Sequence, residues 1–315
     1  MTTLDGWLDD WKARGVISHG QHALLLGLTR HQPFSVFLEL NILLYVGVAA
    51  FVGGLAWTVQ SHATQLGEVV VLAVLWAIFA GCLWYCFSRA QPWSPAETPS
   101  PSLIFDYALY LGSLTWSVEL GYVENRFHLL SDQWDIYLLA TACLFFALAY
   151  RFDNRFVLSL ALSALAGWFG IKIQHWPGSD EASYRNLAIL YSVITGAAGI
   201  TLDRLSIKPH FFLTYLNLAA NILFIAVLSG VFSREGYALW FLFLIAVCGS
   251  SLAYGLPRKQ FSFVAYAAVY GYVGLSSVLI REVSDSIFIL MYFVLTGSAM
   301  VVLLGRIAGR IGRES

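Results

Sequence analysis

Ten stretches of apolar residues, each long enough to cross a bilayer, alternate with short polar segments along the chain. A membrane-spanning helix needs about 20 predominantly apolar residues, rising about 1.5 Å per residue. The pattern therefore predicts an all-α fold, a polytopic transmembrane helical bundle of about ten spans in contact with the lipid bilayer. The spans are expected at residues 35–58, 66–88, 102–121, 134–150, 155–174, 185–203, 211–231, 236–255, 261–280 and 285–304.

The basic residues between these stretches are distributed unevenly. With ten spans, 13 of the 18 lysines and arginines fall on the side that holds the N-terminus. Positive charge is retained on the cytoplasmic side of a membrane. We therefore predict a multi-pass protein of the cell inner (plasma) membrane, with both the N-terminus and the C-terminus in the cytoplasm.

An amphipathic segment, residues 1–33, precedes the first span and predicts a cytoplasmic helical pair. Its first apolar stripe has helical spacing and consists of Leu4, Trp7, Leu8 and Trp11. Gly15 is expected to end the first helix. Ser18 and Gln21 have the spacing of a capping box, which starts the second helix. Two roles are open for residues 1–30: a docking surface for a protein partner, or a helical pair lying on the membrane or under the bundle.

A pattern inside the apolar region indicates duplication. Leu148-Ala149-Tyr150 recurs as Leu252-Ala253-Tyr254, and the later group Gly167-Trp168-Phe169-Gly170 recurs at the same separation as Gly271-Tyr272-Val273-Gly274. Residues 34–315 would then divide into a two-span N-terminal part (34–90) and two parallel four-helix repeats (102–205 and 208–306). Parallel repeats of this kind occur in transporters; chance similarity between Gly- and Leu-rich spans is the alternative.

The composition is that of a membrane protein, and it limits the classes of function that the chain can have. The chain is 58% hydrophobic and 12% charged, against about 25% charged residues in soluble domains. A net charge of -1 lacks the excess of basic residues that is typical of nucleic-acid-binding proteins. The four cysteines lie inside apolar stretches, so no disulfide framework is expected. No catalytic, metal-binding or cofactor motif is found, and the short loops leave no room for a soluble catalytic domain, so we expect a non-enzymatic protein.

A few polar residues inside the spans are candidates for a polar pocket, because such groups need a partner or a wet cavity in lipid. Glu119 and Lys172 are predicted at similar depth, where they could pair across helices, either as a structural ion pair or as the mouth of a pocket. A second group combines amides and hydroxyls one turn apart on two spans: Thr214, Asn217, Asn221, Tyr266 and Tyr270. These amides either bond to neighbouring helices or contact a substrate.

Two short motifs give a resemblance to a known family. Trp11, Gly15, Ile17, Ser18 and Gln21 precede the first span, and the stretch Gly121, Phe127-His128-Leu129, Ser131-Asp132 follows the third. Over roughly residues 4–175 the chain resembles bacterial membrane proteins catalogued as domain of unknown function 2157. Glu124 and Asn125 stand where the family pattern has a glutamine. The resemblance implies a membrane protein and names no reaction.

Two functions are compatible with these features. The first is a carrier of a small solute or ion, with its polar site between the two repeats. The second is a non-transporting membrane subunit or scaffold that docks a partner through its N-terminal helices.

Overall fold

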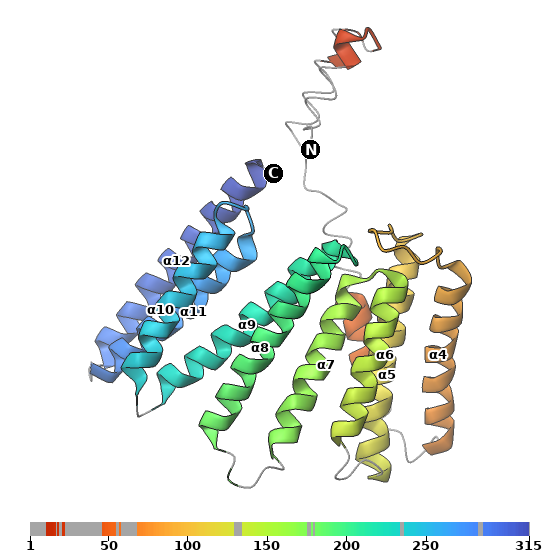
Figure 1. The fold of residues 1–315 in the computed structure, drawn as a ribbon, viewed down its shortest axis with the longest axis horizontal. Coiled ribbons are helices and arrows are strands. Elements are labelled where there is room, and N and C mark those ends of the chain that lie inside the picture. The colour runs from red at the N-terminus through yellow and green to blue at the C-terminus, as the bar shows by residue number, and fades with distance from the viewer. Residues whose placement is uncertain are drawn as a thin grey trace. The chain divides into compact units, whose positions relative to one another are not determined.

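The computed structural model describes residues 11–16, 18, 21–22, 46–54, 57, 68–128, 134–174, 178, 180–233, 236–282 and 286–314. No β-strand occurs in these residues, which confirms the all-α fold class. The long helices, drawn in Figure 1, are α4 (Glu68–Arg89), α5 (Leu103–Phe127), α6 (Trp134–Phe152), α7 (Arg155–Gln174), α8 (Glu181–Arg204), α9 (Phe212–Phe232), α10 (Tyr237–Gly255), α11 (Phe261–Glu282) and α12 (Ser286–Glu314). A 3-10 turn, η1 (Pro209–Phe211), leads into α9.

Within the described residues, eight of these helices are long and apolar enough to cross a membrane. They are α4 and α6 to α12. The predicted first span lies mostly outside the described residues; 46–54 and 57 are helical. The predicted third span forms α5, which is 25 residues long but is not among the eight. Asp106, Glu119, Glu124 and Arg126 make this helix more polar than its neighbours.

Successive helices run in alternating directions, as the contacts between their loops demonstrate. The Thr98 backbone N–H donates to the Asp153 carboxylate at 2.5 Å, and the Lys208 N–H donates to the Pro95 carbonyl at 2.9 Å. The segments after α4, α6 and α8 therefore meet at one end of the bundle. The sequence analysis placed all three on the N-terminal side. Which side of the membrane this is stays a prediction.

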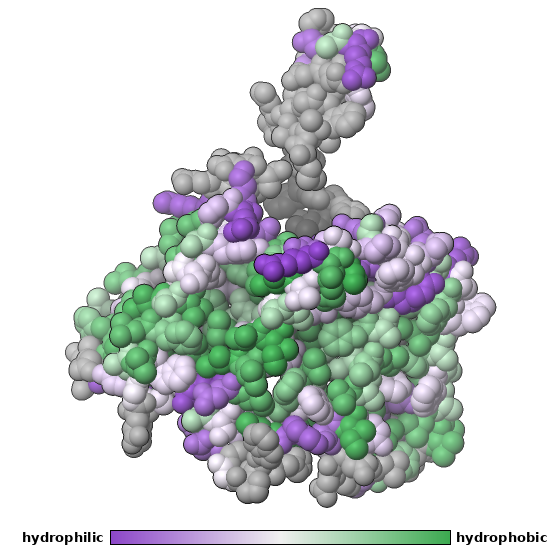
Figure 2. All heavy atoms as spheres, viewed as in Figure 1, coloured by the Kyte–Doolittle hydropathy of each residue, from purple (hydrophilic) through white to green (hydrophobic). Residues whose placement is uncertain are grey.

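The outer surface of the helices is apolar. Trp84, Leu239 and Leu290 are 75%, 72% and 66% exposed. On the face drawn in Figure 2, hydrophobic residues cover the middle of the helices and hydrophilic ones lie toward their ends. A soluble protein rarely exposes an apolar surface of this extent, so these side chains are the ones that contact lipid.

Helix α9 is the element around which the second half of the bundle packs. It contacts α7, α8, α10 and α11. Its buried side chains Phe224, Val227 and Val231 form a cluster with Leu244 of α10. Small residues allow close approach, as is usual between helices in lipid: a Cβ added at Gly230 would lie 2.3 Å from the Trp240 ring, and one at Gly199 would lie 2.7 Å from Tyr215 Cβ.

The N-terminal segment matches two local predictions. Gly15 has φ +71°. The Val16 N–H donates to the Trp11 carbonyl and the Gly15 N–H to the Lys12 carbonyl, the bonding pattern of a Schellman helix end. The Ser18 N–H donates to Gln21 Oε1 at 2.9 Å and the Gln21 N–H to Ser18 Oγ at 3.3 Å, so the capping box is confirmed. The apolar residues Leu4, Trp7 and Leu8 lie outside the described residues.

Corresponding glycines of the two proposed repeats face corresponding helices. Gly167 of α7 lies against Leu138 of α6, and Gly271 of α11 lies against Cys248 of α10. The hydroxyl of Tyr191 in α8 donates to Leu162 of α7, while that of Tyr292 in α12 contacts Ser276 of α11. These parallels are compatible with a duplication, which stays a prediction.

Candidate functional site

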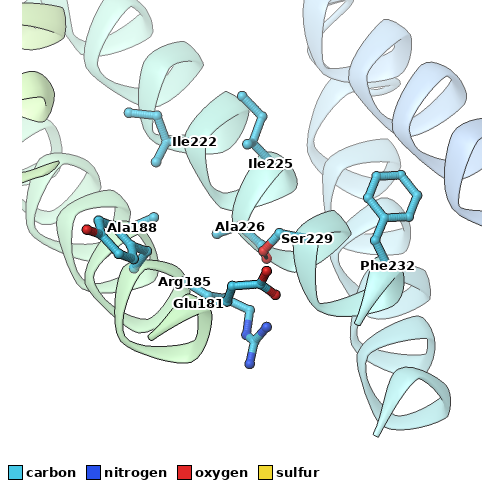
Figure 3. A pocket seen from close by; sticks show the side chains of 9 residues that line it. Glu181, Arg185, Ala188, Ile222, Ile225, Ala226, Ser229 and Phe232 are labelled. Carbon is cyan, nitrogen blue, oxygen red and sulfur yellow. Dashed lines mark hydrogen bonds between the residues drawn. The ribbon is translucent and has the colours of Figure 1, made fainter. Parts of the chain in front are cut away.

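A groove of about 530 Å³ lies between α8 and α9, the helices on either side of the predicted boundary between the two repeats. This volume is within the range of small-molecule sites, about 300–1,000 Å³. Figure 3 shows its walls, the first two turns of α8 and the second half of α9. The lining residues are Glu181, Tyr184, Arg185, Ala188, Ile222, Ile225, Ala226, Ser229 and Phe232.

The polar end of the groove is fixed by the start of α8. Asp180 caps this helix: its carboxylate accepts from the Ser183 hydroxyl at 2.7 Å and from the Ser183 N–H at 2.9 Å. These hydrogen bonds, helped by the charge of Arg185, lower the pKa of Asp180 because they stabilise the ionised carboxylate. Capping sets where the first turn begins and so places Glu181 and Arg185 at the groove.

Arg185 is held by an aromatic ring of a third helix. Its guanidinium carbon lies 4.5 Å from the ring centroid of Trp240 in α10, a cation–π contact. Trp240 in turn packs against Gly230 of α9. The Arg185 Nε is buried and has no hydrogen-bond partner in the described residues. A buried guanidinium donor without an acceptor is costly, and Arg185 is one of the residues that line the groove.

The groove continues inward as an apolar space. A second cavity of about 260 Å³ shares Tyr184, Ala188 and Ile222 with the first. Its remaining walls come from α7 and α8 and consist of Ala166, Phe169, Gly170, Leu187 and Tyr191. The two cavities thus combine a charged mouth with a mostly apolar interior, an arrangement that matches a molecule with a polar head and an apolar tail.

Opposite charges line the mouth without pairing with each other. Glu181 and Arg185 both border the groove, and no salt bridge between them occurs in the part of the chain that the structure describes. In Figure 3 the Glu181 carboxylate points toward Ser229 and the Arg185 guanidinium points away from it. Each charge therefore remains available to a ligand group of opposite sign.

Three of the residues predicted for a polar pocket do come together, between α9 and α11. The Tyr270 hydroxyl donates to Asn221 Oδ1 at 2.6 Å. The Tyr270 ring stacks on Phe224 with centroids 5.0 Å apart, and the Tyr266 ring lies 6.3 Å from that of Tyr270. This is the interhelical bonding that the sequence analysis gave as one of two alternatives. None of the three lines the α8–α9 groove.

The other two members of that group stay within α9. Asn217 donates from Nδ2 to the Leu213 carbonyl of its own helix at 2.8 Å. Its Oδ1 is buried without a hydrogen-bond partner among the described residues. Thr214 is half-buried. Neither residue lines the groove.

The suggested pairing of Glu119 with Lys172 is wrong. Lys172 Nζ instead binds the Asp135 carboxylate at the start of α6, at 2.6 Å and with 59% of the lysine side chain exposed. Glu119 is 4% exposed, and neither of its carboxyl oxygens has a hydrogen-bond partner in the described residues. Similar depth in the membrane does not determine which helices are neighbours.

The sequence analysis also missed a buried ion cluster at the opposite end of the bundle from the groove. Asp153 binds Lys208 Nζ at 2.8 Å and His210 Nε2, and the three side chains are 3%, 2% and 8% exposed. Lys208 Nζ also donates to the Ala96 carbonyl at 3.2 Å. The cluster ties the segment between α4 and α5 to the ends of α6 and α9. Asp153 lies between α6 and α7, and Lys208 and His210 lie between α8 and α9, so only the tertiary fold brings them together.

These features define the class: a multi-pass helical membrane protein whose spans contact the lipid bilayer. Residues 9–158 match the model of a family described as "Predicted membrane protein (DUF2157)". The family resemblance predicted from the motifs is thereby confirmed for the N-terminal half of the chain. No curated protein and no solved structure matches the chain.

Proposed function

We propose that the protein is a carrier of a membrane amphiphile with a zwitterionic head, such as a phospholipid, which it binds in the α8–α9 groove. The observation that carries this proposal is the combination of Arg185 and Glu181 at the mouth with an apolar interior between α7, α8 and α9. An anionic head group would bind Arg185, a cationic one would bind Glu181, and the tail would occupy the inner cavity.

The head group must supply most of the selectivity. Lipid tails gain little by moving from the bilayer into an apolar groove, because both environments are equally apolar. A charge-assisted hydrogen bond contributes about 1.5–3 kcal/mol, or roughly tenfold to a hundredfold in affinity. Arg185 carries such donors, and its Nε has no acceptor within the described residues.

Transport would follow from motion at the same boundary. The groove lies between the last helix of the first predicted repeat and the first helix of the second. In carriers built from repeats, one unit rocks against the other around a site at their interface. The location of the groove supports this mechanism, and the sequence repeat that underlies it is itself a prediction.

Photocrosslinking tests the binding step. Purified protein is reconstituted in vesicles that contain a phosphatidylcholine with a photoreactive acyl chain, and crosslinked peptides are mapped. We expect crosslinks on α8 and α9, and their loss in Ile222→Trp, which fills the groove. Leu239→Trp is the control, since this side chain is 72% exposed on α10. Equal labelling of wild type and Ile222→Trp would exclude the groove.

A flux assay tests the carrier step. Movement of a fluorescent phosphatidylcholine between leaflets is followed with a membrane-impermeant quencher in proteoliposomes and in protein-free vesicles. Arg185→Gln should lower movement of zwitterionic and anionic analogues about tenfold or more, and Glu181→Gln should affect only heads that carry a cationic ammonium group, choline included. If lipid is crosslinked but its movement is no faster than in protein-free vesicles, the protein binds lipid without carrying it, and the carrier proposal is rejected.

The scaffold alternative stays a prediction. The residues it depends on are described only in part, at 11–16, 18 and 21–22. Deleting residues 1–30 and comparing co-purifying proteins tests it, and an unchanged set of partners would reject docking through this segment.

A further inference from the structure

Glu119 is a buried acid of α5 whose carboxyl group has no hydrogen-bond partner in the described residues. It lies in α5, sixteen residues after Leu103 and so about 24 Å along the helix. Only 4% of the residue is exposed, and Oε1 and Oε2 both lack a hydrogen bond in the described residues. The groove and its proposed function do not involve this residue.

The face of α5 that carries Glu119 is packed against α4 and α6. About two turns before Glu119, a Cβ at Gly112 would lie 3.1 Å from Cys82 Cβ of α4. The Trp116 ring packs 5.2 Å from the Phe79 ring of α4, and its Nε1 donates to Thr141 of α6 at 3.1 Å. These contacts leave Glu119 in an apolar setting.

No cation in the described part of the chain neutralises this acid. The salt bridges there use Arg155, Lys172, Lys208 and His210, each with another carboxylate. The titratable side chains that the structure describes on the neighbouring helices are Cys82, Tyr85, Cys86 and Arg89 on α4, Asp135, Tyr137, Cys143, Tyr150 and Arg151 on α6, and Arg155 and Lys172 on α7. Helix α5 itself carries Asp106, Tyr107, Tyr110, Tyr122, Glu124 and Arg126. None of them forms a hydrogen bond or ion pair with Glu119.

An ionised carboxylate in this position would be strongly disfavoured. Charged residues at the centre of a membrane helix cost about 2.5–3.5 kcal/mol even on insertion scales, where snorkelling and water reduce the penalty. A metal ion is a poor remedy, because no group of three or more His, Cys, Asp or Glu side chains that could hold one occurs in the described residues. Thr115 Oγ1, one turn earlier, is also buried without a hydrogen-bond partner among the described residues.

We propose that Glu119 is a proton-binding site. The carboxylate takes up one proton from a hydronium ion: an O–H bond forms on the carboxyl group, one O–H bond of hydronium breaks, and water is left. The neutral acid can be buried in α5 without a counter-ion, and releasing its proton requires either water or a cation to reach this helix. The bundle then has two states that differ by one proton, independently of any ligand in the groove.

Infrared spectroscopy on the reconstituted full-length protein tests the proposal. A neutral carboxylic acid has a carbonyl band well separated from those of carboxylates. At neutral pH we expect the wild type to show a band of this kind that Glu119→Gln lacks. Glu97→Gln serves as the control, because Glu97 is 62% exposed and bound to Arg155, and it should leave the band unchanged. Identical spectra for wild type and Glu119→Gln would overturn the proposal.

A chemical test uses the wild-type protein and so does not depend on folding of the variant. N,N′-dicyclohexylcarbodiimide is an apolar reagent that adds to protonated carboxyl groups and leaves a stable acylurea after rearrangement. We expect an adduct on Glu119 at neutral pH, found by peptide mass spectrometry, and less of it as the pH rises. A lack of adduct, or an adduct blocked by sodium ions at constant pH, would indicate an ionised group and overturn the proposal.

Discussion

Close packing at Gly230 makes a quantitative prediction that connects the fold to the groove. A methyl group at this position would lie 2.3, 2.5 and 2.9 Å from three carbons of the Trp240 ring. Atoms cannot approach this closely, and a ring cannot move aside as a flexible chain can. Gly230→Ala must therefore push α9 and α10 apart or rotate Trp240, the ring on which Arg185 rests.

The size of the effect can be bracketed from two other glycines. Overpacking a well-packed core costs about 1–3 kcal/mol, and we expect Gly230→Ala to lie in this range. At Gly274 the added Cβ would meet the Cδ2 end of Leu244 at 2.2 Å, which a rotamer change relieves, so the cost should be smaller. At Gly249 no atom lies within 4 Å, so alanine should stabilise the helix by about 0.5–1 kcal/mol.

The assay is equilibrium unfolding of the three variants in the same lipid–detergent mixture, followed by tryptophan fluorescence and a second probe. The expected order of stability is Gly249→Ala above wild type, then Gly274→Ala, then Gly230→Ala. Gly230→Ala should also reduce crosslinking of the lipid probe, since it displaces Arg185. If Gly230→Ala is as stable as Gly249→Ala, Trp240 is not seated against α9 and the reasoning fails.

Three further predictions concern polar contacts. Lys208→Met should destabilise the bundle by about 3–5 kcal/mol because it leaves Asp153 buried and without its lysine, and a double-mutant cycle with Asp153→Asn should show strong coupling in unfolding experiments. Asn221→Leu and Tyr270→Phe, by contrast, should couple by only about 0.6 kcal/mol, and by at most about 1.7, in the same kind of cycle. The third concerns the pH dependence of stability. The folded-state pKa of Asp180 lies below its usual value. The contribution of Asp180 to stability is therefore present above about pH 4 and is lost as the pH falls through the lowered pKa. Thermal unfolding midpoints of wild type and Asp180→Ala should therefore converge in acid, and a constant difference at all pH values would contradict the assignment.

The helices could be predicted from the sequence because burial in lipid requires long, continuous apolar segments. The predicted span 185–203 lies within α8, and the span 211–231 coincides closely with α9. The polar helix α5 was also predicted, although it is not among the eight helices that are apolar enough to cross a membrane. The Asn221–Tyr270 contact followed from the same logic, since polar groups at one helical turn need partners on an adjacent helix.

The site could not be predicted in the same way, because its residues come together only through tertiary packing. Arg185 is not among the candidate site residues of the sequence analysis, and nothing in its local sequence indicates the contact with the ring of Trp240. Glu119 and Lys172 lie at similar depths along their helices, but their side chains do not bind each other. Asp153 and Lys208 lie in separate loops, and their pairing depends on α6 ending and α9 beginning at the same end of the bundle.

The family match separates the two proposed sites. Residues 9–158 include α4, α5 and α6 and therefore Glu119, whereas Arg185 and the α8–α9 groove lie beyond the matched part. The comparison thus bears on the helices that bury the acid and gives no information on the groove. A protein that matches the family through this segment alone could carry the acid without the groove. Infrared and carbodiimide experiments on such a protein would therefore test whether other members of the family also have the buried acid. The lipid experiments test only the groove of this chain.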